Sequence, residues 1–280
     1  MDAISADETP TLPGGNERLR YNQTSEIKSG NKARINFLHF TIGSLMLDSL
    51  KQMLSMEKVS VNLMYSRSME NNKFFQDMVK NYHTDCTSRH KKYFFIQQMS
   101  MGVALCRMPL SKDQYFMTIE ASARRNFKKS VKQGFTFAPI DYNEHLDAVW
   151  DILRSAPVRQ GNMPDEMLNN RPTPHSDPKS KSYYHDYPYF GVFSPEGKLV
   201  AYSSCLIAGE LAMITDIYGH ADYLEEGIVP MMIIEIGKWL YDHYPASIWF
   251  GYGTYFGAME NMRRFKRKFN FMPYRVKWIL

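Results

Sequence analysis

The chain has 280 residues, of which 44% are hydrophobic and 22% charged, which is typical of a globular protein and excludes a disordered, collagen-like or disulfide-scaffold chain. Its net charge of +5 permits anionic ligands without specifying one. Three widely separated cysteines favour a reducing compartment, and neither a signal-peptide pattern nor a membrane-spanning run stands out, so we expect a cytoplasmic protein.

Two regions precede residue 111. Residues 1–33 are polar and rich in Gly, Pro, Asn, Ser and Thr, which predicts a flexible tail. Residues 34–110 alternate between short strand and helix patterns, which predicts an N-terminal αβ region. Its expected elements are a strand at 35–42, a helix at 44–56, a strand at 59–65, a helix at 71–82 and a long strand or hairpin at 92–110.

Residues 111–280 form the second expected domain. Ser111 is a suitable helix N-cap with Asp113 in the first turn, and Gly134 is a suitable residue just past the helix end. Residues 157–188 lack periodicity and hold six prolines, which is typical of a functional or disordered loop. The other expected elements are a strand at 135–140, a helix at 143–156, a β-meander at 189–220, a helix at 231–244, a strand at 247–253, a helix at 260–269 and a final strand at 273–280.

The junction between the meander and the next helix is the first candidate site. A strand running into a helix presents unpaired N–H groups and the positive end of the helix dipole, which together favour a pyrophosphate. Gly227 would let a phosphate approach the backbone, and Pro230 suits a first helical turn. Glu225 and Glu226 would repel a phosphate, so spacing alone favours an ordinary connection in which these acids complement the helix dipole.

Two basic helices form the second candidate. Residues 124–132 carry five cations and no acid, and residues 263–268 carry five cations in six positions. Contact with a phosphorylated ligand or RNA and a simple solvated face are both compatible with such runs.

The remaining polar residues give weaker signals. His83, Cys86 and His90 have a metal-like spacing, but no fourth ligand is near in sequence, so we expect no metal. The chain has no HExxH, GxSxG, GxxxxGK[ST] or GxGxxG motif. Tyrosines and histidines at 183–189, Tyr252 and Tyr255 suit acid, base or recognition roles, or ordinary packing.

Three segments carry a resemblance to a known family. They are SKDQYFMTIEASARRNFKKSVKQGF (111–135), EEGIVPMMIIEIGKWLYDHYPASIWFGYG (225–253) and MRRFKRKFNFMPYRV (262–276), the last with an FK-x-x-F pattern. In this order they resemble the GNAT acyltransferase superfamily, in the branch related to Fem-type peptidyltransferases. The resemblance implies an α/β (α+β) fold with a mixed, mostly antiparallel sheet flanked by helices, in two GNAT-like halves of which the N-terminal one is reduced.

The resemblance also implies a reaction, the transfer of an acyl group to an amine. Our main expectation is an N-acyltransferase that uses acyl-CoA as co-substrate and a small-molecule amine as acceptor. A tRNA-dependent aminoacyl transferase and a catalytically silent binding protein are the alternatives. The chain departs from the GNAT pattern because its cofactor loop keeps one glycine, Lys266 stands where many GNATs have a tyrosine, and Asn270 replaces the usual glycine.

The implied site residues follow from the same resemblance. The expected acids and bases are Asp216, Tyr218, His220, Tyr252 and Tyr255. The expected contacts to acyl-CoA are Ile214, Thr215, Ile217, Gly227, Ile228, Val229, Met231 and Lys266. The expected contacts to the acceptor are Arg125, Arg159 and His185.

Overall fold

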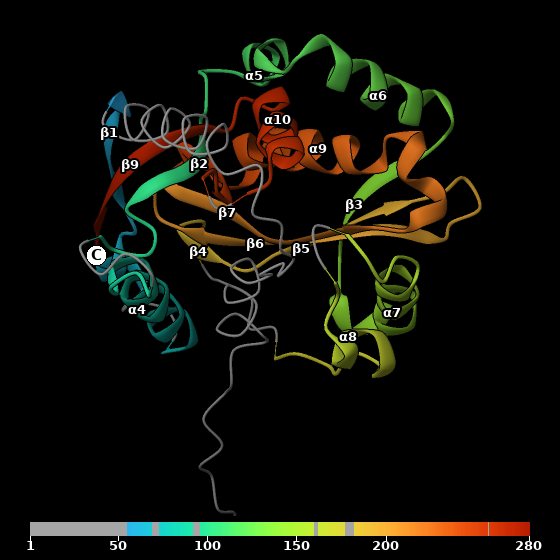
Figure 1. Cartoon of the computed structure of the whole chain (residues 1–280), viewed down its shortest axis with the longest axis horizontal. Helices are drawn as coiled ribbons and strands as arrows, with labels where there is room; N and C mark the ends of the chain where they lie inside the picture. The colour runs from blue at the N-terminus through green and yellow to red at the C-terminus, as the bar shows by residue number, and fades with distance from the viewer. Residues whose placement is uncertain (1–54, 69–72, 92–95, 160–161, 177–181, 257) are drawn as a thin grey trace, which may run out of the picture.

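The computed structural model describes residues 55–68, 73–91, 96–159, 162–176, 182–256 and 258–280. The expected tail at 1–33 and the expected elements between 35 and 54 lie outside the described residues. Within them, strands form a single sheet in the order β1-β9-β2-β8-β7-β6-β5-β3, with β4 paired to β6 (Figure 1). The strands are β1 (Lys58–Asn62), β2 (Met101–Arg107), β3 (Thr136–Ile140), β4 (His185–Asp186), β5 (Tyr189–Phe193), β6 (Leu199–Ala208), β7 (Leu211–Gly219), β8 (Trp249–Thr254) and β9 (Met272–Ile279).

The sheet is mostly antiparallel. Among the described strands, β1 and β9 pair in parallel, as do β7 and β8, and the remaining pairs are antiparallel. This confirms the expected mixed, mostly antiparallel sheet. The helices are α3 (Tyr65–Ser68), α4 (Lys73–Thr87), α5 (Lys112–Thr118), α6 (Ala121–Lys132), α7 (Leu146–Arg154), α8 (Asp165–Asn169), α9 (Ile228–His243) and α10 (Glu260–Lys268), with 3-10 turns η2 (Tyr142–His145) and η3 (Ala221–Glu226).

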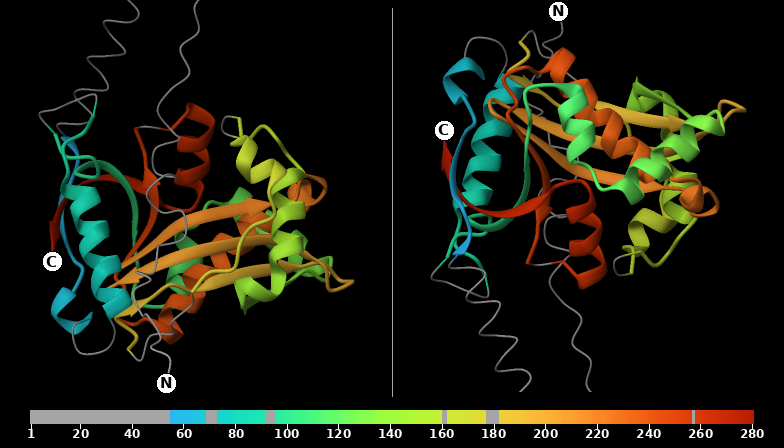
Figure 2. Two further views of the ribbon diagram at one scale, coloured as in Figure 1. Left: turned by 90° about the horizontal axis from the view of Figure 1, so that it is seen from below. Right: turned by 90° about the horizontal axis from the view of Figure 1, so that it is seen from above.

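Helices cover both faces of the sheet (Figures 1 and 2). On one face, the apolar side of α9 packs on the central strands, and α5 and α6 lie outside α9. On the other face, α4 and α7 pack over opposite ends of the sheet, each with its own apolar cluster. The strands between α4 and α7 are therefore the part of this face that neither helix covers (Figure 2).

Most expected elements are present, with shifted ends. Ser111 caps α5 by accepting a hydrogen bond from the Gln114 N–H at 3.2 Å, as expected. The single helix predicted from residue 111 is interrupted, because Ile119 adopts an extended conformation and is buried in the core. Gly134 has φ +85°, the left-handed conformation expected of a residue beyond a helix end. The aperiodic stretch 157–188 contains α8 and β4, and the Trp150 indole N–H donates to Leu168 O at 3.1 Å, which ties α8 to α7.

The N-terminal region shares the sheet with the rest of the chain. β2 lies between β8 and β9 and is antiparallel to both, while β1 is at the sheet edge beside β9. The described part of 34–110 thus adds strands to one continuous sheet. The expected division at residue 110, and the two halves that it implies, stay a prediction.

Candidate functional site

Strands β7 and β8 diverge in the middle of the sheet. They pair only from Leu211 to Met213, although β7 continues beside β6 to Gly219 and β8 continues beside β2 to Thr254. The Met213 side chain lies where they part, and its sulfur accepts a hydrogen bond from the Gly253 N–H at 3.3 Å. A Cβ on Gly251 would lie 2.5 Å from Met213 Cε, so a larger residue there would make the Met213 side chain move. The facing edges of the two strands beyond Met213 are not paired with each other.

A β-bulge lies at the same place. Ser204 pairs with Asp216 and Cys205 with Ile214, which leaves Thr215 as the extra residue of β7. Bulges re-aim side chains and are frequent beside active sites. Here the bulge places the Thr215 hydroxyl and the Asp216 carboxylate beside the same side chain, Ser204. The coincidence of bulge and strand divergence marks this point as the best candidate for a functional site.

Hydroxyl groups surround the bulge. The Thr215 hydroxyl lies 2.8 Å from both the Tyr187 hydroxyl and the Ser204 hydroxyl, and Ser204 donates to Asp216 Oδ2 at 3.1 Å. Burial, and to a lesser degree the charge of Asp216, raises the pKa of Tyr187 to about 12. Tyr187 is therefore a neutral phenol at physiological pH.

Lys266 contributes a buried amine next to the end of β8. Its side chain comes from α10, is only 5% exposed, and donates to Thr254 O at 2.7 Å. The nitrogen also lies 4.7 Å from the centre of the Tyr252 ring. Burial lowers the pKa of Lys266 to about 8. An amine that titrates close to neutral pH is suited to proton transfer or to stabilising developing negative charge.

The expected pyrophosphate loop is covered by α6. Gly227 has φ +79°, and a Cβ there would lie 2.6 Å from Asn126 O of α6. The Glu226 carboxylate lies 2.9 Å from Lys129 Nζ, and the hydrogen bonds from Lys129 and Gln133 lower its pKa. An acid paired with α6 therefore directly precedes the residues where phosphates were expected.

The expected contacts beyond Gly227 belong to the first turn of α9. Ile228 and Met231 bury their side chains in the core, so toward a ligand they offer backbone groups. Met231 N–H already donates to Gly227 O at 2.9 Å. Val229 packs against the same core. On β7, Ile214 and Ile217 belong to that core as well, on the α9 side of the sheet, whereas Thr215 is exposed.

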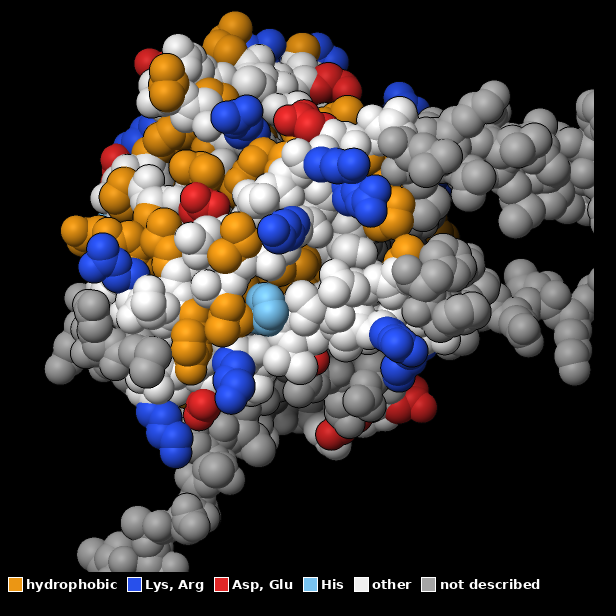
Figure 3. Space-filling view, turned by 90° about the vertical axis from the view of Figure 1, so that its left-hand side faces the viewer, with side chains coloured by type: hydrophobic (Ala, Val, Ile, Leu, Met, Phe, Trp, Pro, Cys, Tyr) orange, Lys and Arg blue, Asp and Glu red, His pale blue; other side chains and the backbone are white. Residues whose placement is uncertain are grey.

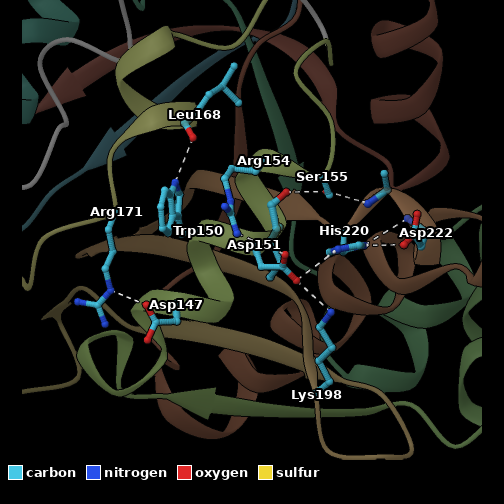
Figure 4. A network of polar contacts seen from close by, with 12 residues as sticks. Asp147, Trp150, Asp151, Arg154, Ser155, Leu168, Arg171, Lys198, His220 and Asp222 are labelled. Atoms are coloured by element: carbon cyan, nitrogen blue, oxygen red, sulfur yellow. Dashed lines mark hydrogen bonds and ion pairs between the residues drawn. The ribbon is translucent and has the colours of Figure 1, made fainter.

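His220 lies at the end of β7 within a polar network (Figure 4). Its Nδ1 accepts a hydrogen bond from the Asp222 N–H at 3.3 Å, which caps η3. Its Nε2 lies 3.5 Å from Asp151 Oδ2, and Lys198 Nζ lies 3.0 Å from the same oxygen. The hydrogen bond from Lys198, more than any other neighbour, holds the pKa of Asp151 below its usual range. These contacts give His220 a clear structural role.

The three expected acceptor-binding residues are not brought together. The Arg159 guanidinium donates to Gly219 O at 2.9 Å and Ile152 O at 2.6 Å, and lies 5.5 Å from the centre of the Tyr218 ring. His185 is buried at the other end of β6, where its Nε2 lies 2.8 Å from Leu63 O. Arg125 is exposed on α6, and Tyr255 is buried in the core beneath α9. Arg159 and Tyr218 are neighbours, whereas His185 and Arg125 are remote from them.

Comparisons with known proteins concern the fold. No family model and no curated protein sequence matches the chain. Among solved structures, FemX is 10% identical with a TM-score of 0.48, and the match covers 62% of this chain and 59% of the FemX chain. L-PGS from Bacillus licheniformis is 14% identical with a TM-score of 0.42, and the match covers 61% of this chain and 56% of L-PGS. A conserved protein of unknown function from Bacteroides thetaiotaomicron is 12% identical with a TM-score of 0.40, and the match covers 62% of this chain and 58% of that protein. The chain thus spans less than three fifths of each of these structures.

The exposed cations of α6 are mostly without acidic partners. Arg125, Lys128 and Lys132 form no ion pair in the described part of the chain, although Lys129 pairs with Glu226. Arg124, Arg125 and Lys128 line a shallow hollow on this helix. On α10, by contrast, Glu260 pairs with Arg263 and Arg267. On the side of the molecule shown in Figure 3, Lys and Arg side chains are scattered among hydrophobic and acidic ones.

Neither a metal-ligand cluster nor a membrane-spanning helix is present within the described ranges. No three His, Cys, Asp or Glu side chains there come together as metal ligands. No helix there is both long and apolar enough to cross a bilayer.

Ser204 and Tyr187 are the residues that the sequence analysis did not assign to the site. Tyr187 belongs to the noted aromatic stretch, but nothing in the sequence connects it to β7. Ser203 and Ser204 interrupt the otherwise apolar strand LVAYSSCLIA and are fully buried. Because a buried hydroxyl needs a partner, that pair of serines was the available signal.

Proposed function

We propose that the chain is a GNAT-like transferase that passes an aminoacyl group from tRNA to an amine, with the acyl group held where β7 and β8 diverge. The observation that carries the choice of donor is the cover over the start of α9. With Glu226 bound to Lys129 beside Gly227, the loop disfavours the pyrophosphate of coenzyme A. A donor whose phosphates lie elsewhere fits this loop better.

The surface of α6 supports a polyanionic donor. Arg125, Lys128 and Lys132 are spaced three and four residues apart, so they follow one face of the helix and project toward solvent. Unpaired cations along one face suit the phosphates of a nucleic acid. The resemblance to Fem-type peptidyltransferases points to the same donor, because that branch implies an aminoacyl group carried on tRNA.

The chemistry needs two proton transfers. The acceptor nitrogen attacks the ester carbonyl, the new C–N bond forms, and the C–O bond to the terminal ribose breaks. In this proposal Asp216 accepts the proton that the amine loses, and Lys266 donates a proton to the departing ribose oxygen. A Lys266 pKa of about 8 suits this exchange near neutral pH. Direct transfer of this kind requires no protein nucleophile.

Acyl-CoA is the second candidate donor. No side chain caps the first turn of α9, and its N-cap residue is a glycine in the left-handed conformation. Free N–H groups at a helix start are a general anion site. If Glu226 moved aside, coenzyme A phosphates would find these groups, and the acceptor would then be a small-molecule amine.

Two assays with the full chain separate the donors. Retention of labelled aminoacyl-tRNA on a filter is measured over a range of salt concentrations. Thermal unfolding is followed with coenzyme A, acetyl-CoA and a longer acyl-CoA; a ligand at 100 times its Kd stabilises by about 2.7 kcal/mol. We expect salt-sensitive tRNA retention and no stabilisation by coenzyme A. Stabilisation by an acyl-CoA without tRNA retention would mean that acyl-CoA, and not aminoacyl-tRNA, is the donor. The absence of both effects would favour a silent binding protein.

A further inference from the structure

The polar groups at the bulge form a connected series that the reaction outlined above does not yet use. Tyr187 precedes β5, Ser204 lies on β6, and Thr215 and Asp216 lie on β7, so three separate segments meet here. Tyr187 packs with the clusters beneath α4 and α7, which places the series on the sheet face opposite α9. On that face, the strands between α4 and α7 are uncovered by either helix (Figure 2).

We propose that Tyr187, Thr215 and Ser204 are positioning residues, whose hydroxyls form a one-way hydrogen-bond chain that orients the Asp216 carboxylate toward the attacking amine. This inference rests on the proposed function for the role of Asp216, whereas the hydrogen-bond chain itself can be tested without any assumption about function. It also assigns the approach of the acceptor to the sheet face that carries α4 and α7.

The direction of the chain follows from counting hydrogens. A carboxylate accepts only, so the single hydrogen of Ser204 points at Asp216 Oδ2, 3.1 Å away. The Ser204 oxygen is then free to accept from Thr215 at 2.8 Å, and Thr215 in turn accepts from Tyr187 at 2.8 Å. Thr215 has an alternative acceptor in Ser204 O, but at the longer distance of 3.1 Å. Three hydroxyls aligned head to tail polarise one another toward the carboxylate.

Burial makes this arrangement rigid. Ser204 is fully buried, and the neighbouring Ser203 hydroxyl donates to Asp216 O at 2.7 Å, which fixes the backbone of the bulge. At the far end Tyr187 stays protonated at neutral pH, so its hydrogen is available to the Thr215 oxygen. Asp216 is thus held both at its backbone carbonyl, by Ser203, and at its carboxylate, by Ser204.

Thr215 offers a matched pair of variants that test the hydrogen-bond chain. Thr215 is exposed and lies on a strand, where valine and serine are both tolerated sterically, so neither substitution should prevent folding. Thr215→Val removes the hydroxyl, whereas Thr215→Ser keeps it. Tyr187→Phe removes the first donor. Tyr183→Phe is the control, because Tyr183 is more than half exposed and belongs to the same stretch of sequence.

The first measurement needs no activity. In protein labelled with 13C at the aspartate carboxyls, the Asp216 signal is assigned by its loss in Asp216→Asn, and spectra are compared at pH 7. We expect this signal to move in Thr215→Val and in Tyr187→Phe, and to stay in place in Thr215→Ser and Tyr183→Phe. A signal that stays in place in both hydroxyl-deleting variants would refute the proposed hydrogen-bond chain, whatever the protein catalyses.

The second measurement tests the role in transfer. With the donor identified, Thr215→Val and Tyr187→Phe should each lower kcat roughly tenfold, because a hydrogen bond to a charged group is weakened, while KM for the donor stays unchanged. The double variant should lose little more than either single variant, since both break the same chain. Independent, multiplicative losses, or a kcat unchanged in both variants despite a shifted carboxyl signal, would refute positioning. Failure of the proposed function itself would show as no transfer in the unaltered chain.

Discussion

Two parts of β7 place polar groups in opposite ways. Where β7 leaves β8, two of the neighbouring polar groups are buried: Lys266 makes a single hydrogen bond to a described residue, and Ser204 has no exposure at all. At the end of β7, the polar side chains have partners: His220 Nε2 lies 3.5 Å from Asp151, and Asp151 forms an ion pair with the partly exposed Lys198 (Figure 4). Exposed ion pairs contribute little to stability, whereas a buried amine lowers it. Polar groups retained at such a cost are the better candidates for function.

The largest expected effect comes from Lys266→Met. Because folding lowers the pKa of this lysine from about 10.5 to about 8, the buried charge costs roughly 3 kcal/mol at pH 7. The variant should therefore unfold at higher denaturant concentration than the unaltered protein while transfer falls by about 10²–10⁴-fold.

The pH dependence sharpens this test. Between pH 8 and 10.5 the unfolded chain binds more protons at this site than the folded one, so the stability of the unaltered protein rises with pH there. The advantage of the variant should be complete below pH 8 and vanish by about pH 10.5. Denaturant melts across this range measure it, and an advantage that does not change with pH would contradict the buried charge.

Gly227→Ala tests whether α6 closes the start of α9. The left-handed backbone alone costs about 1–2 kcal/mol for alanine, and the new Cβ would also meet Asn126 O at 2.6 Å. Gly197→Ala is the matched control, because Gly197 has φ +81° and nothing lies within 4 Å of its Cβ position. Denaturant melts should show a larger loss at Gly227. Equal losses would mean that α6 can move away from this loop.

The cations of α6 have a smaller expected effect, on binding alone. Replacing Arg125, Lys128 and Lys132 by glutamine should lower tRNA affinity about tenfold or more and reduce the slope of log affinity against log salt by roughly 2–3. The control replaces Lys58, Arg275 and Lys277, three exposed cations on the β1–β9 edge. Filter binding at several salt concentrations measures both. An equal loss in the control would mean that net charge, and not α6, attracts the RNA.

The smallest effect is expected at the end of β7. His220→Asn keeps a capping group for η3 and loses only a 3.5 Å contact with a partly exposed aspartate, so the free energy of unfolding should change by less than about 1 kcal/mol and transfer should not change. The Asp151–Lys198 pair should stabilise the fold above the usual titration range of aspartate and stop doing so as the pH falls below it. A large loss of transfer in His220→Asn would return His220 to the list of catalytic bases.

The sequence predicted local structure well, whereas it did not predict the contacts around the candidate site. Helix caps such as Ser111, turn residues such as Gly134 and the apolar periodicity of α9 are local signals, and each of these elements formed. Asp216 and Lys266 were both among the expected site residues, because family resemblance assigned positions on β7 and in the FK-x-x-F helix. Their contacts were not predicted, since Tyr187, Ser204 and Thr254 lie far from them along the chain or on other strands.

The order of the described elements and their mixed α/β class therefore follow from local patterns in the sequence. Tertiary structure alone decided that β2 enters between β8 and β9, that α6 covers Gly227, and that His185 and Arg159 lie at opposite ends of β6. The physical reason is that hydrogen bonds within helices and turns depend on neighbours in sequence. Strand pairing, a β-bulge and the burial of a lysine depend instead on distant segments, whose meeting is set by packing of the whole sheet.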